Sequence, residues 1–268
     1  MTHQSQSLPI SFECQASRWR EGEQFVAEHS LGLVINGEME LDFGAYRKTV
    51  VAGDVFFCRR NQLLKFKKLN GSEGNFKTVT LFFDETTLTN FAKEFKYKTS
   101  VQGAVSNFEI PNNELIKVFM QSLLAYEDFL STDVSLAQLK QREALLLLLK
   151  NDLTWQNVLF DFSRPLKIDL GDFMNKNFQF NVRLERFAYL TGRSLTSFKR
   201  DFRLLFNEPP ARWLLKKRLE AAREMLTKER KTSVEIYQDL GFEDLSHFSY
   251  AFKKYYGIAP SALTCKTA

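Results

Sequence analysis

The sequence predicts an α+β fold, with an antiparallel β-barrel and flanking helices in the N-terminal part and an all-α C-terminal part. Three observations support this prediction. Short apolar segments separated by turn signals fill residues 25–83, helical spacing replaces them after Asp84, and one helical pattern occurs twice near the C-terminus. We place one domain at residues 1–160 and the other at 161–268.

The segments between residues 25 and 83 have the composition and spacing of short antiparallel strands. They are rich in β-branched and apolar residues, and Asn36-Gly37 is a hairpin signal, with further turns at Gly44-Ala45 and Ala52-Gly53-Asp54. The predicted strands are residues 25–35, 38–43, 46–51, 55–58, 63–68 and 77–83. So many short strands at close spacing predict a small barrel or sandwich.

Helical spacing begins after Asp84, and the predicted helices cover residues 85–95, 112–130 and 136–151. The second has an apolar stripe formed by Leu115, Val118, Phe119, Leu123, Tyr126 and Leu130, and the third has one that includes Leu139, Ala144, Leu146 and Leu147. The leucine run 145–149 is expected to be buried, either inside the N-terminal domain or at a dimer interface. Residues 152–165 form a connector too apolar to be a flexible linker, so we expect it to pack on a neighbour.

A pattern near the C-terminus repeats without a gap after 50 residues. The first copy contains Leu190, Leu195, Phe198, Phe202, Phe206 and Pro210, and the second contains Leu240, Leu245, Phe248, Phe252, Tyr256 and Pro260. Ser194 and Asp244 stand at matching N-cap positions. In each copy a short helix, 184–190 or 234–240, leads through a three-residue turn containing Gly into the second helix, as in helix-turn-helix units.

Two further helices complete the predicted C-terminal part. One contains Leu166, Leu170, Phe173 and Met174 at helical spacing, and the other joins the two units from about residue 210 to residue 228. The joining helix is roughly 28 Å long at 1.5 Å per residue. This length is close to the roughly 34 Å between successive major-groove faces of DNA. A rigid helix of this size would place both units on one side of a duplex.

Charge is distributed unevenly along the chain. Residues 166–268 contain 19 Lys and Arg against 12 Asp and Glu, whereas residues 1–165 contain 18 against 20. The basic half is therefore the half with the repeat. Such a distribution is typical of a phosphate-binding surface.

These C-terminal residues carry a family resemblance. Residues 241–263 read GFEDLSHFSYAFKKYYGIAPSAL and resemble the signature of the AraC/XylS family of bacterial transcription regulators. Residues 191–214 (TGRSLTSFKRDFRLLFNEPPARWL) resemble its first helix-turn-helix, and residues 218–226 (RLEAAREML) resemble the long helix between the units. The β-rich part resembles the family's cupin-like sensing and dimerisation domain by its organisation, most clearly at residues 52–67 (AGDVFFCRRNQLLKFK).

The sequence departs from this family at two places. Asn207 stands where a Gly often follows the first recognition helix, and residues 261–264 lack the usual closing aromatic residue and Arg. Because Asn also adopts the left-handed conformation, the expected fold is unchanged.

In each copy, the apolar stripe of the second helix faces inward. The other face of that helix is therefore the candidate DNA-reading surface. The expected base-facing residues are Thr196, Ser197, Lys199 and Arg200 on the first helix and Ser246, His247, Ser249 and Tyr250 on the second. Phosphate contacts are expected from residues nearer the C-terminal ends, namely Arg203, Lys253 and Lys254. Arg200 is the main candidate for direct readout, because Arg can donate to both O6 and N7 of guanine. The alternative is an ordinary solvated basic helix face.

We expect no catalytic residue, metal or cofactor. His3, His29 and His247 are the only histidines, and the barrel segment contains only His29, whereas cupin enzymes bind a metal with clustered histidines. Cys14, Cys58 and Cys265 lack metal-ligand spacing and fit a reducing cytoplasm. The longest apolar run, 144–149, is too short to span a bilayer, and no export signal is visible.

The sequence therefore predicts a cytoplasmic, sequence-specific transcription regulator that binds double-stranded DNA and is not an enzyme. We also expect a homodimer, because the stripes on 112–130 and 136–151 exceed what one small barrel needs for cover. Two alternatives stay open. A protein partner, rather than a small-molecule effector, would control the N-terminal domain, or the chain would be a cupin-type enzyme with an appended helical domain.

Overall fold

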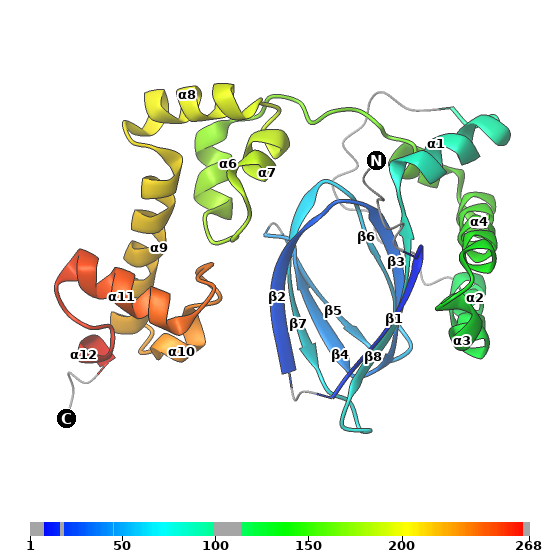
Figure 1. The fold of residues 1–268 in the computed structure, drawn as a ribbon, viewed down its shortest axis with the longest axis horizontal. Coiled ribbons are helices and arrows are strands. Elements are labelled where there is room, and N and C mark those ends of the chain that lie inside the picture. Colours follow the sequence, from blue (N-terminus) through cyan, green and yellow to red (C-terminus); the bar gives the residue numbers. More distant parts are fainter. Residues whose placement is uncertain (1–7, 17–18, 45, 99–113, 265–268) are drawn as a thin grey trace. The chain divides into compact units, whose positions relative to one another are not determined.

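The fold is that of a computed structural model in which residues 8–16, 19–44, 46–98 and 114–264 are described. The chain divides into two compact units, one built mainly from residues before Arg164 and the other mainly from Arg164–Ala268 (Figure 1). The described strands all lie before Glu85, and the described elements after Arg164 are helices, so the predicted α+β class is confirmed. His3, Cys265 and the predicted helix start at Asn112 lie outside the described residues.

The described strands form two four-stranded sheets. One has the order β1-β8-β3-β6 and the other β2-β7-β4-β5, so the strands divide between two sheets instead of closing into one barrel. The pairings β1–β8, β3–β8, β3–β6 and β4–β5 are antiparallel. The strands are β1 (Ile10–Gln15), β2 (Trp19–Val26), β3 (His29–Asn36), β4 (Glu38–Asp42), β5 (Arg47–Val51), β6 (Val55–Cys58), β7 (Gln62–Leu69) and β8 (Phe76–Phe83).

The turn at Asn36-Gly37 was predicted to be a hairpin, and this prediction is wrong. It joins β3 to β4, which belong to different sheets. Asn36 is buried and its side-chain amide donates to the backbone oxygen of Asn75 at 2.8 Å, which fixes this corner to the β7–β8 connection. Gly37 has a φ of +93°, and a Cβ there would lie 2.4 Å from the carbonyl oxygen of Leu69. The Asn-Gly pair therefore makes a corner between sheets.

Two strand predictions need further correction. The predicted strand 25–35 is interrupted, because β2 ends at Val26 and β3 begins at His29. β1 and most of β2 were not predicted. β2 (WREGEQFV) contains mostly charged and polar residues and few apolar ones. Its sequence therefore lacks the apolar periodicity that identifies a half-buried strand.

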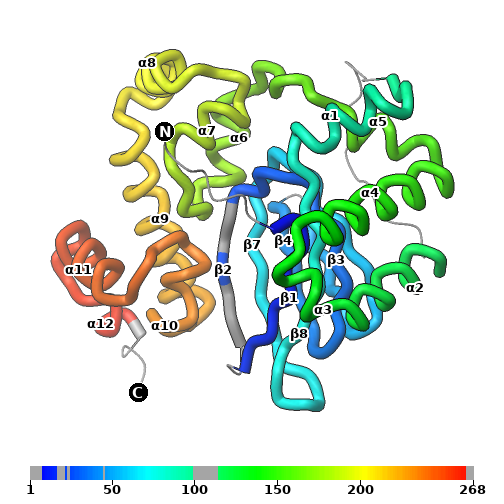
Figure 2. The backbone as a smooth tube through the Cα atoms, turned by 45° about the vertical axis from the view of Figure 1, so that its right-hand side comes forward, coloured from blue at the N-terminus to red at the C-terminus, as the bar shows by residue number. Residues whose placement is uncertain are grey.

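Helices cover one face of the β1-β8-β3-β6 sheet (Figures 1 and 2). The described helical segments of this unit are α1 (Glu85–Glu94), α2 (Glu114–Ser122), the 3-10 turn η1 (Leu123–Tyr126), α3 (Glu127–Leu130), α4 (Val134–Asn151), the 3-10 turn η2 (Leu153–Trp155) and α5 (Gln156–Leu159). The connector is confirmed to pack on a neighbour, since Trp155, Val158, Leu159 and Phe160 are buried in the core of this unit. Leu145, Leu148 and Leu149 of the leucine run are buried in the same core.

The predicted apolar stripe of residues 112–130 is partly wrong. Phe119, Leu123 and Leu130 are buried, but so are Ile116 and Met120, whereas Leu115, Val118 and Tyr126 are exposed. The helix changes to a 3-10 turn after Ser122, which alters the residue spacing that the prediction assumed. Because both faces are apolar, the sequence could not decide which one faces the sheet. Leu139 of the second predicted stripe is exposed as well.

The second unit consists of helices α6 (Leu170–Asn177), α7 (Leu184–Leu190), α8 (Leu195–Phe206), α9 (Pro210–Thr227), α10 (Ser233–Ile236), α11 (Leu245–Tyr256) and α12 (Ser261–Thr264). Two boundaries differ from the prediction. α6 begins after Asp169, because Asp169 caps the helix by accepting from the Asp172 amide. Leu166 therefore lies outside α6, and it is 83% exposed. α10 ends at Ile236, and the chain reaches Leu240 through turns that retain the Leu240-to-Ile236 backbone hydrogen bond.

Candidate nucleic-acid interface

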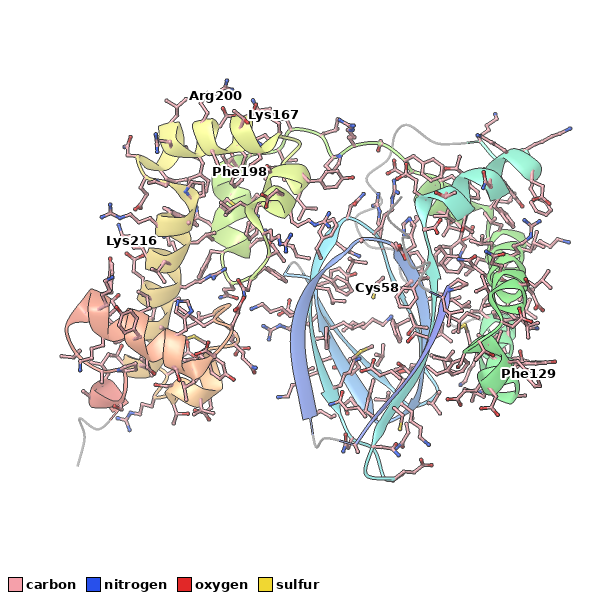
Figure 3. All side chains as sticks on the ribbon, in the orientation of Figure 1. Cys58, Phe129, Lys167, Phe198, Arg200 and Lys216 are labelled. Atoms are coloured by element: carbon pink, nitrogen blue, oxygen red, sulfur yellow. The ribbon has the colours of Figure 1, made fainter. Side chains whose placement is uncertain are left out.

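The first helix-turn-helix unit consists of α7, the turn 191–194 and α8. Gly192 in this turn has a φ of +67°, and a Cβ there would lie 2.5 Å from the carbonyl carbon of Leu166, so a larger residue would be both strained and obstructed. Ser194 caps α8 by accepting from the amide of Ser197 at 3.2 Å, as predicted. Phe198 and Phe202 are fully buried, and Figure 3 shows Phe198 below α8. Asn207 ends the helix in the left-handed conformation expected of it, with a φ of 55°.

The second helix-turn-helix unit repeats this construction with α10, the turn 237–244 and α11. Gly241 has a φ of +77°, and Asp244 caps α11 by accepting from the amide of His247 at 2.6 Å. Phe248 and Phe252 are fully buried, and Gly257 ends the helix in the left-handed conformation. The gapless alignment of the two sequence copies therefore corresponds to matching helix starts, buried rings and helix ends.

α9 belongs to the cores of both units. Its first half contributes Trp213 and Leu214 to the core around Phe198 and Phe202. Its second half contributes Leu219, Ala222 and Leu226 to the core around Phe248 and Phe252. One continuous helix of 18 residues therefore carries both helix-turn-helix units.

The predicted reading residues lie on the outer faces of α8 and α11. Those exposed are Thr196, Lys199, Arg200, Arg203, Ser246, His247, Tyr250, Lys253 and Lys254, and those half-buried are Ser197 and Ser249. The Arg200 side chain is 69% exposed and points away from Phe198 (Figure 3), and its counterpart Tyr250 is 67% exposed. The Nζ of Lys254 lies 5.9 Å from the centre of the Tyr250 ring. Both helices thus present polar and basic side chains to solvent.

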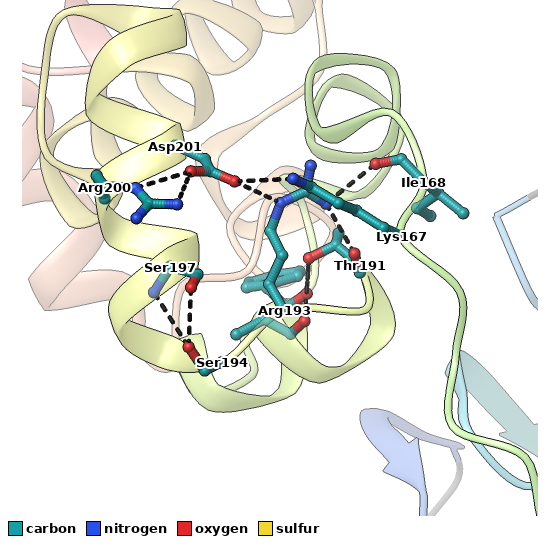
Figure 4. A network of polar contacts seen from close by, with 10 residues as sticks. Lys167, Ile168, Thr191, Arg193, Ser194, Ser197, Arg200 and Asp201 are labelled. Atoms are coloured by element: carbon teal, nitrogen blue, oxygen red, sulfur yellow. Dashed lines mark hydrogen bonds and ion pairs between the residues drawn. The ribbon is translucent and has the colours of Figure 1, made fainter.

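A polar network that the sequence did not predict surrounds Arg200 (Figure 4). Arg200 donates from Nη2 and Nε to one carboxylate oxygen of Asp201, at 3.0 and 3.2 Å. Arg193 donates from Nε to the other oxygen at 3.2 Å, and Lys167 Nζ lies 3.6 Å from that oxygen. Hydrogen bonds from Arg200 and Arg193, together with the charge of Lys167, lower the pKa of the Asp201 carboxyl. Asp201 is therefore ionised at neutral pH and accepts both hydrogen bonds from the Arg200 guanidinium.

Arg193 also fastens the chain segment before α6 to the recognition helix. Its Nη1 donates to the backbone oxygens of Ile168 and Thr191, at 3.0 and 2.7 Å (Figure 4). The side chain is only 8% exposed. The only sequence signal for this arrangement is an acidic residue, Asp201, directly after Arg200 in an otherwise basic helix face.

Two apolar side chains near the reading face were also missed. Leu204 is 76% exposed and Leu205 is exposed as well, although both lie on α8. They line an open groove of about 560 Å³ together with Lys167, Ile168, Asp169, Leu170, Arg193 and Asp201. Leu204 occupies the position that Lys254 occupies in the second unit, so the two outer faces differ in charge as well as in size.

The N-terminal unit, built mainly from residues before Arg164, shows no arrangement for metal binding in its described residues. His29 is fully buried, stacks on Phe57 with ring centres 5.4 Å apart, and accepts at Nδ1 from the Arg60 amide at 3.1 Å. Burial, followed by the charges of Arg60 and Arg59, lowers the pKa of His29 to about 3. Within the described ranges, His, Cys, Asp and Glu side chains form no cluster of three that could hold a metal ion. His29 is therefore a neutral core residue.

Comparison with known families identifies both parts of the chain. A helix-turn-helix domain model of the AraC type matches residues 187–264, which include α8 and α11, and a model of the ExsA N-terminal regulatory domain matches residues 29–157. The chain belongs to the AraC/XylS family. The domain models and the relatives that this AraC/XylS member matches belong to transcription regulators and not to enzymes.

The relatives are distant and match only in part. VirF, a virulence regulon transcriptional activator of Yersinia enterocolitica, is 28% identical over 142 residues, which cover 52% of this chain and 51% of VirF. ExsA of Pseudomonas aeruginosa is 28% identical over 89 residues, which cover 33% of this chain and 32% of ExsA. The AraC/XylS member described here thus spans about half the length of the curated relatives it matches.

Solved structures also match over most of the chain. The crystal structure of an apo ToxT variant from Vibrio cholerae aligns with 12% identity and a TM-score of 0.39, and the alignment covers 96% of this chain and 97% of ToxT. Across the described part of this AraC/XylS family chain, no helix is long and apolar enough to cross a membrane.

Proposed function

We propose that this protein is a sequence-specific transcription regulator that binds double-stranded DNA through α8 and α11. The observation that carries the proposal is the pair of matching helix-turn-helix units on one helix, α9, each with an exposed polar and basic face. The base-facing and phosphate-facing roles of the residues in those faces are part of this proposal. A cytoplasmic location follows from the same function.

The reading faces support different modes of DNA recognition. Arg200 presents a guanidinium held by Asp201, which suits paired hydrogen bonds to guanine O6 and N7. α11 has no Arg on its exposed face and offers Ser246, His247 and Tyr250 instead. We expect the first unit to contribute more base discrimination and the second to contribute more through shape and phosphate contacts.

Salt-dependent binding to duplex DNA tests this proposal. Phosphate contacts release counterions, so the affinity of the full chain and of fragment 164–268 should fall steeply as salt rises. The fragment should retain this behaviour because the basic excess lies in residues 166–268. A fragment that folds, as judged by circular dichroism, and binds no duplex at low salt would refute the proposal.

We further propose that the residues before about position 160 form a regulatory domain that also dimerises. The motivating feature is a set of exposed apolar side chains on α2, η1, α3 and α4, namely Leu115, Val118, Tyr126, Phe129 and Leu139. Phe129 is 65% exposed and projects away from α3 (Figure 3). Apolar surface of this kind commonly becomes an interface between subunits. The resemblance of the β-rich part of the sequence to a cupin-like domain adds to this proposal.

Light scattering on residues 1–160 tests self-association. We expect a dimer at concentrations of tens of micromolar, roughly the range in which modest interfaces form. Phe129→Ser should weaken the dimer, whereas Leu153→Ser, which changes an exposed leucine of this unit outside that set of side chains, should not. A clean monomer for the unchanged fragment would refute the dimer proposal.

A small-molecule effector and a regulatory protein are both compatible with this regulatory domain. A thermal-shift screen against sugars, aromatic acids and metals separates them, because a ligand that binds only the folded state raises the melting temperature. Large shifts with organic ligands would favour an effector, and a screen without shifts would favour a protein partner. Shifts with metals alone would favour the enzyme alternative, which the matched families already disfavour.

A further inference from the structure

Arg218 lies in the middle of α9, between the residues that α9 gives to the two helix-turn-helix cores. The two cores share no member, since Trp213 and Leu214 belong to one and Leu219, Ala222 and Leu226 to the other. Each core can therefore hold its own unit to α9. The angle between the units then depends on how straight α9 stays between the two cores, where a helix can bend unless other contacts restrain it.

The Arg218 guanidinium contacts backbone from the α6–α7 loop, whose Phe180 belongs to the first core, and from the turn of the second helix-turn-helix unit. Nε and Nη2 donate to the carbonyl oxygens of Phe178 and Phe180, both at 2.9 Å, in the loop between α6 and α7. Nη1 donates to the carbonyl oxygen of Gly241 at 3.0 Å, in the turn between α10 and α11. Hydrogen bonds from a charged donor are roughly twice as strong as neutral ones, and the planar guanidinium holds all three oxygens in one geometry.

Two further contacts join the same loop and turn. A Cβ on Gly241 would lie 2.4 Å from the carbonyl oxygen of Gln179, so the turn approaches the loop more closely than any other residue type would allow. The side-chain amide of Asn181 donates to Glu243 at 3.3 Å. The loop 178–181 and the turn 241–243 are therefore in direct contact, with Arg218 between them.

We propose that Arg218 is a positioning residue that locks the two helix-turn-helix units into one rigid reader with a fixed spacing between its DNA contacts. The inference rests on the proposed DNA-binding function and extends it to the geometry of the target. With the lock in place, α8 and α11 reach only two major-groove segments at one separation and one rotational phase. Without it, each unit still folds on its half of α9, and bending of α9 between the two cores lets the pair adapt to other separations.

The test measures how affinity depends on the spacing between the two contacted segments. A duplex selected by the full chain from a random pool is compared with the same duplex carrying two inserted base pairs between the segments. The insertion moves one groove face by about 7 Å and rotates it by about 70° relative to the other. For the unchanged protein, we expect the insertion to lower affinity about tenfold or more, since one unit loses its contacts.

Arg218→Ala should bind the parent duplex more weakly and should lose less than about threefold on insertion. Arg212→Ala is the matched control, because it removes the same charge from an exposed side chain of the same helix. The control should keep the full insertion penalty even if its overall affinity falls. A uniform loss of phosphate binding changes both affinities and leaves their ratio unaltered, so the ratio reports positioning and not charge.

Full insertion sensitivity in a folded Arg218→Ala variant would overturn the proposal. If that variant does not fold by circular dichroism, Arg218→Lys and Asn181→Ala replace it, since each removes only part of the contact and should give intermediate tolerance. If the unchanged protein binds DNA but is insensitive to insertion, the lock is wrong and the proposed function stands. If it binds no duplex at all, the proposed function fails first.

Discussion

Phe198 and Phe202 in the first helix-turn-helix unit and Phe248 and Phe252 in the second are all fully buried at matching positions. Matching positions outside these rings have diverged. Arg200 and Asp201 of α8 correspond to Tyr250 and Ala251 of α11, and Arg193 in the first turn corresponds to Glu243 in the second. The interior requirement is the same because each recognition helix packs on a core of aromatic rings. The exterior is free to specialise, and only the first unit surrounds an arginine with a charged network.

The shared interior gives the largest expected effect. Phe198→Ala and Phe248→Ala should each lower the free energy of unfolding by about 3–5 kcal/mol, because each removes a fully buried ring and leaves a cavity. Chemical denaturation of fragment 164–268, followed by circular dichroism, measures the change. The control Leu204→Ala, at an exposed position of α8, should stay within about 0.5 kcal/mol of the unchanged fragment. If only one of the two Phe variants is destabilised, the units do not have equivalent cores.

Base discrimination should separate the two exteriors. Arg200→Ala should cost about 1–3 kcal/mol of binding free energy and relax preference at one base pair, because it removes a guanidinium that suits paired donation to guanine. Tyr250→Ala, at the matching position, should change preference less. Affinities for a panel of single-base duplex variants, with melting measured in parallel, decide the point. Equal weakening on every sequence, or loss of folding, would show that the reading face of α8 is assigned wrongly.

Lys253 should act on all sequences alike. It lies in the last turn of α11, where a side chain reaches a phosphate more readily than a base edge. Lys253→Ala should therefore weaken binding to the whole panel uniformly and reduce the salt slope by roughly one unit. A change of preference at a particular base pair would move Lys253 into the base-facing set.

Asp201 should give the smallest effect, and affinity and preference should change in opposite directions. Asp201→Asn removes a negative charge from α8, the helix that we expect to face DNA. The binding free energy for unrelated sequences should therefore become more favourable by less than about 1 kcal/mol. Preference at the base pair read by Arg200 should fall, because the guanidinium loses its fixed partner. Glu220→Gln, an exposed acidic residue on α9, makes the same charge change away from Arg200 and is the control. Unchanged preference in Asp201→Asn would mean that the network does not position Arg200.

The C-terminal unit was predictable from the sequence because local signals there agree with one another. Helix caps at Ser194 and Asp244, apolar stripes and glycine turns all point to the same two units. The exposed positions of Arg200 and Tyr250 followed from the same periodicity. The links between segments were not predictable, because Arg193 and Arg218 make them by donating to backbone oxygens, which have no side-chain signature.

The N-terminal unit was predicted less accurately for physical reasons. The residues of β2 are mostly charged or polar, so periodicity could not identify that strand. The pair Asn36-Gly37 favours a tight turn, but only tertiary contacts such as that with Asn75 decide whether the turn joins neighbouring strands or two sheets. On α2, both Leu115 and Ile116 lie in apolar stripes, and contact with the sheet decides that Ile116 is buried.

Hydroxyl-radical footprinting of the full chain on a selected duplex tests the central claim most directly. If α8 and α11 read adjacent major-groove segments, the protein should protect two short segments on one face, about 10–10.5 base pairs apart from centre to centre. Arg200→Ala should weaken one of these footprints before the other. A single protected segment, or two segments on opposite faces of the duplex, would contradict the account.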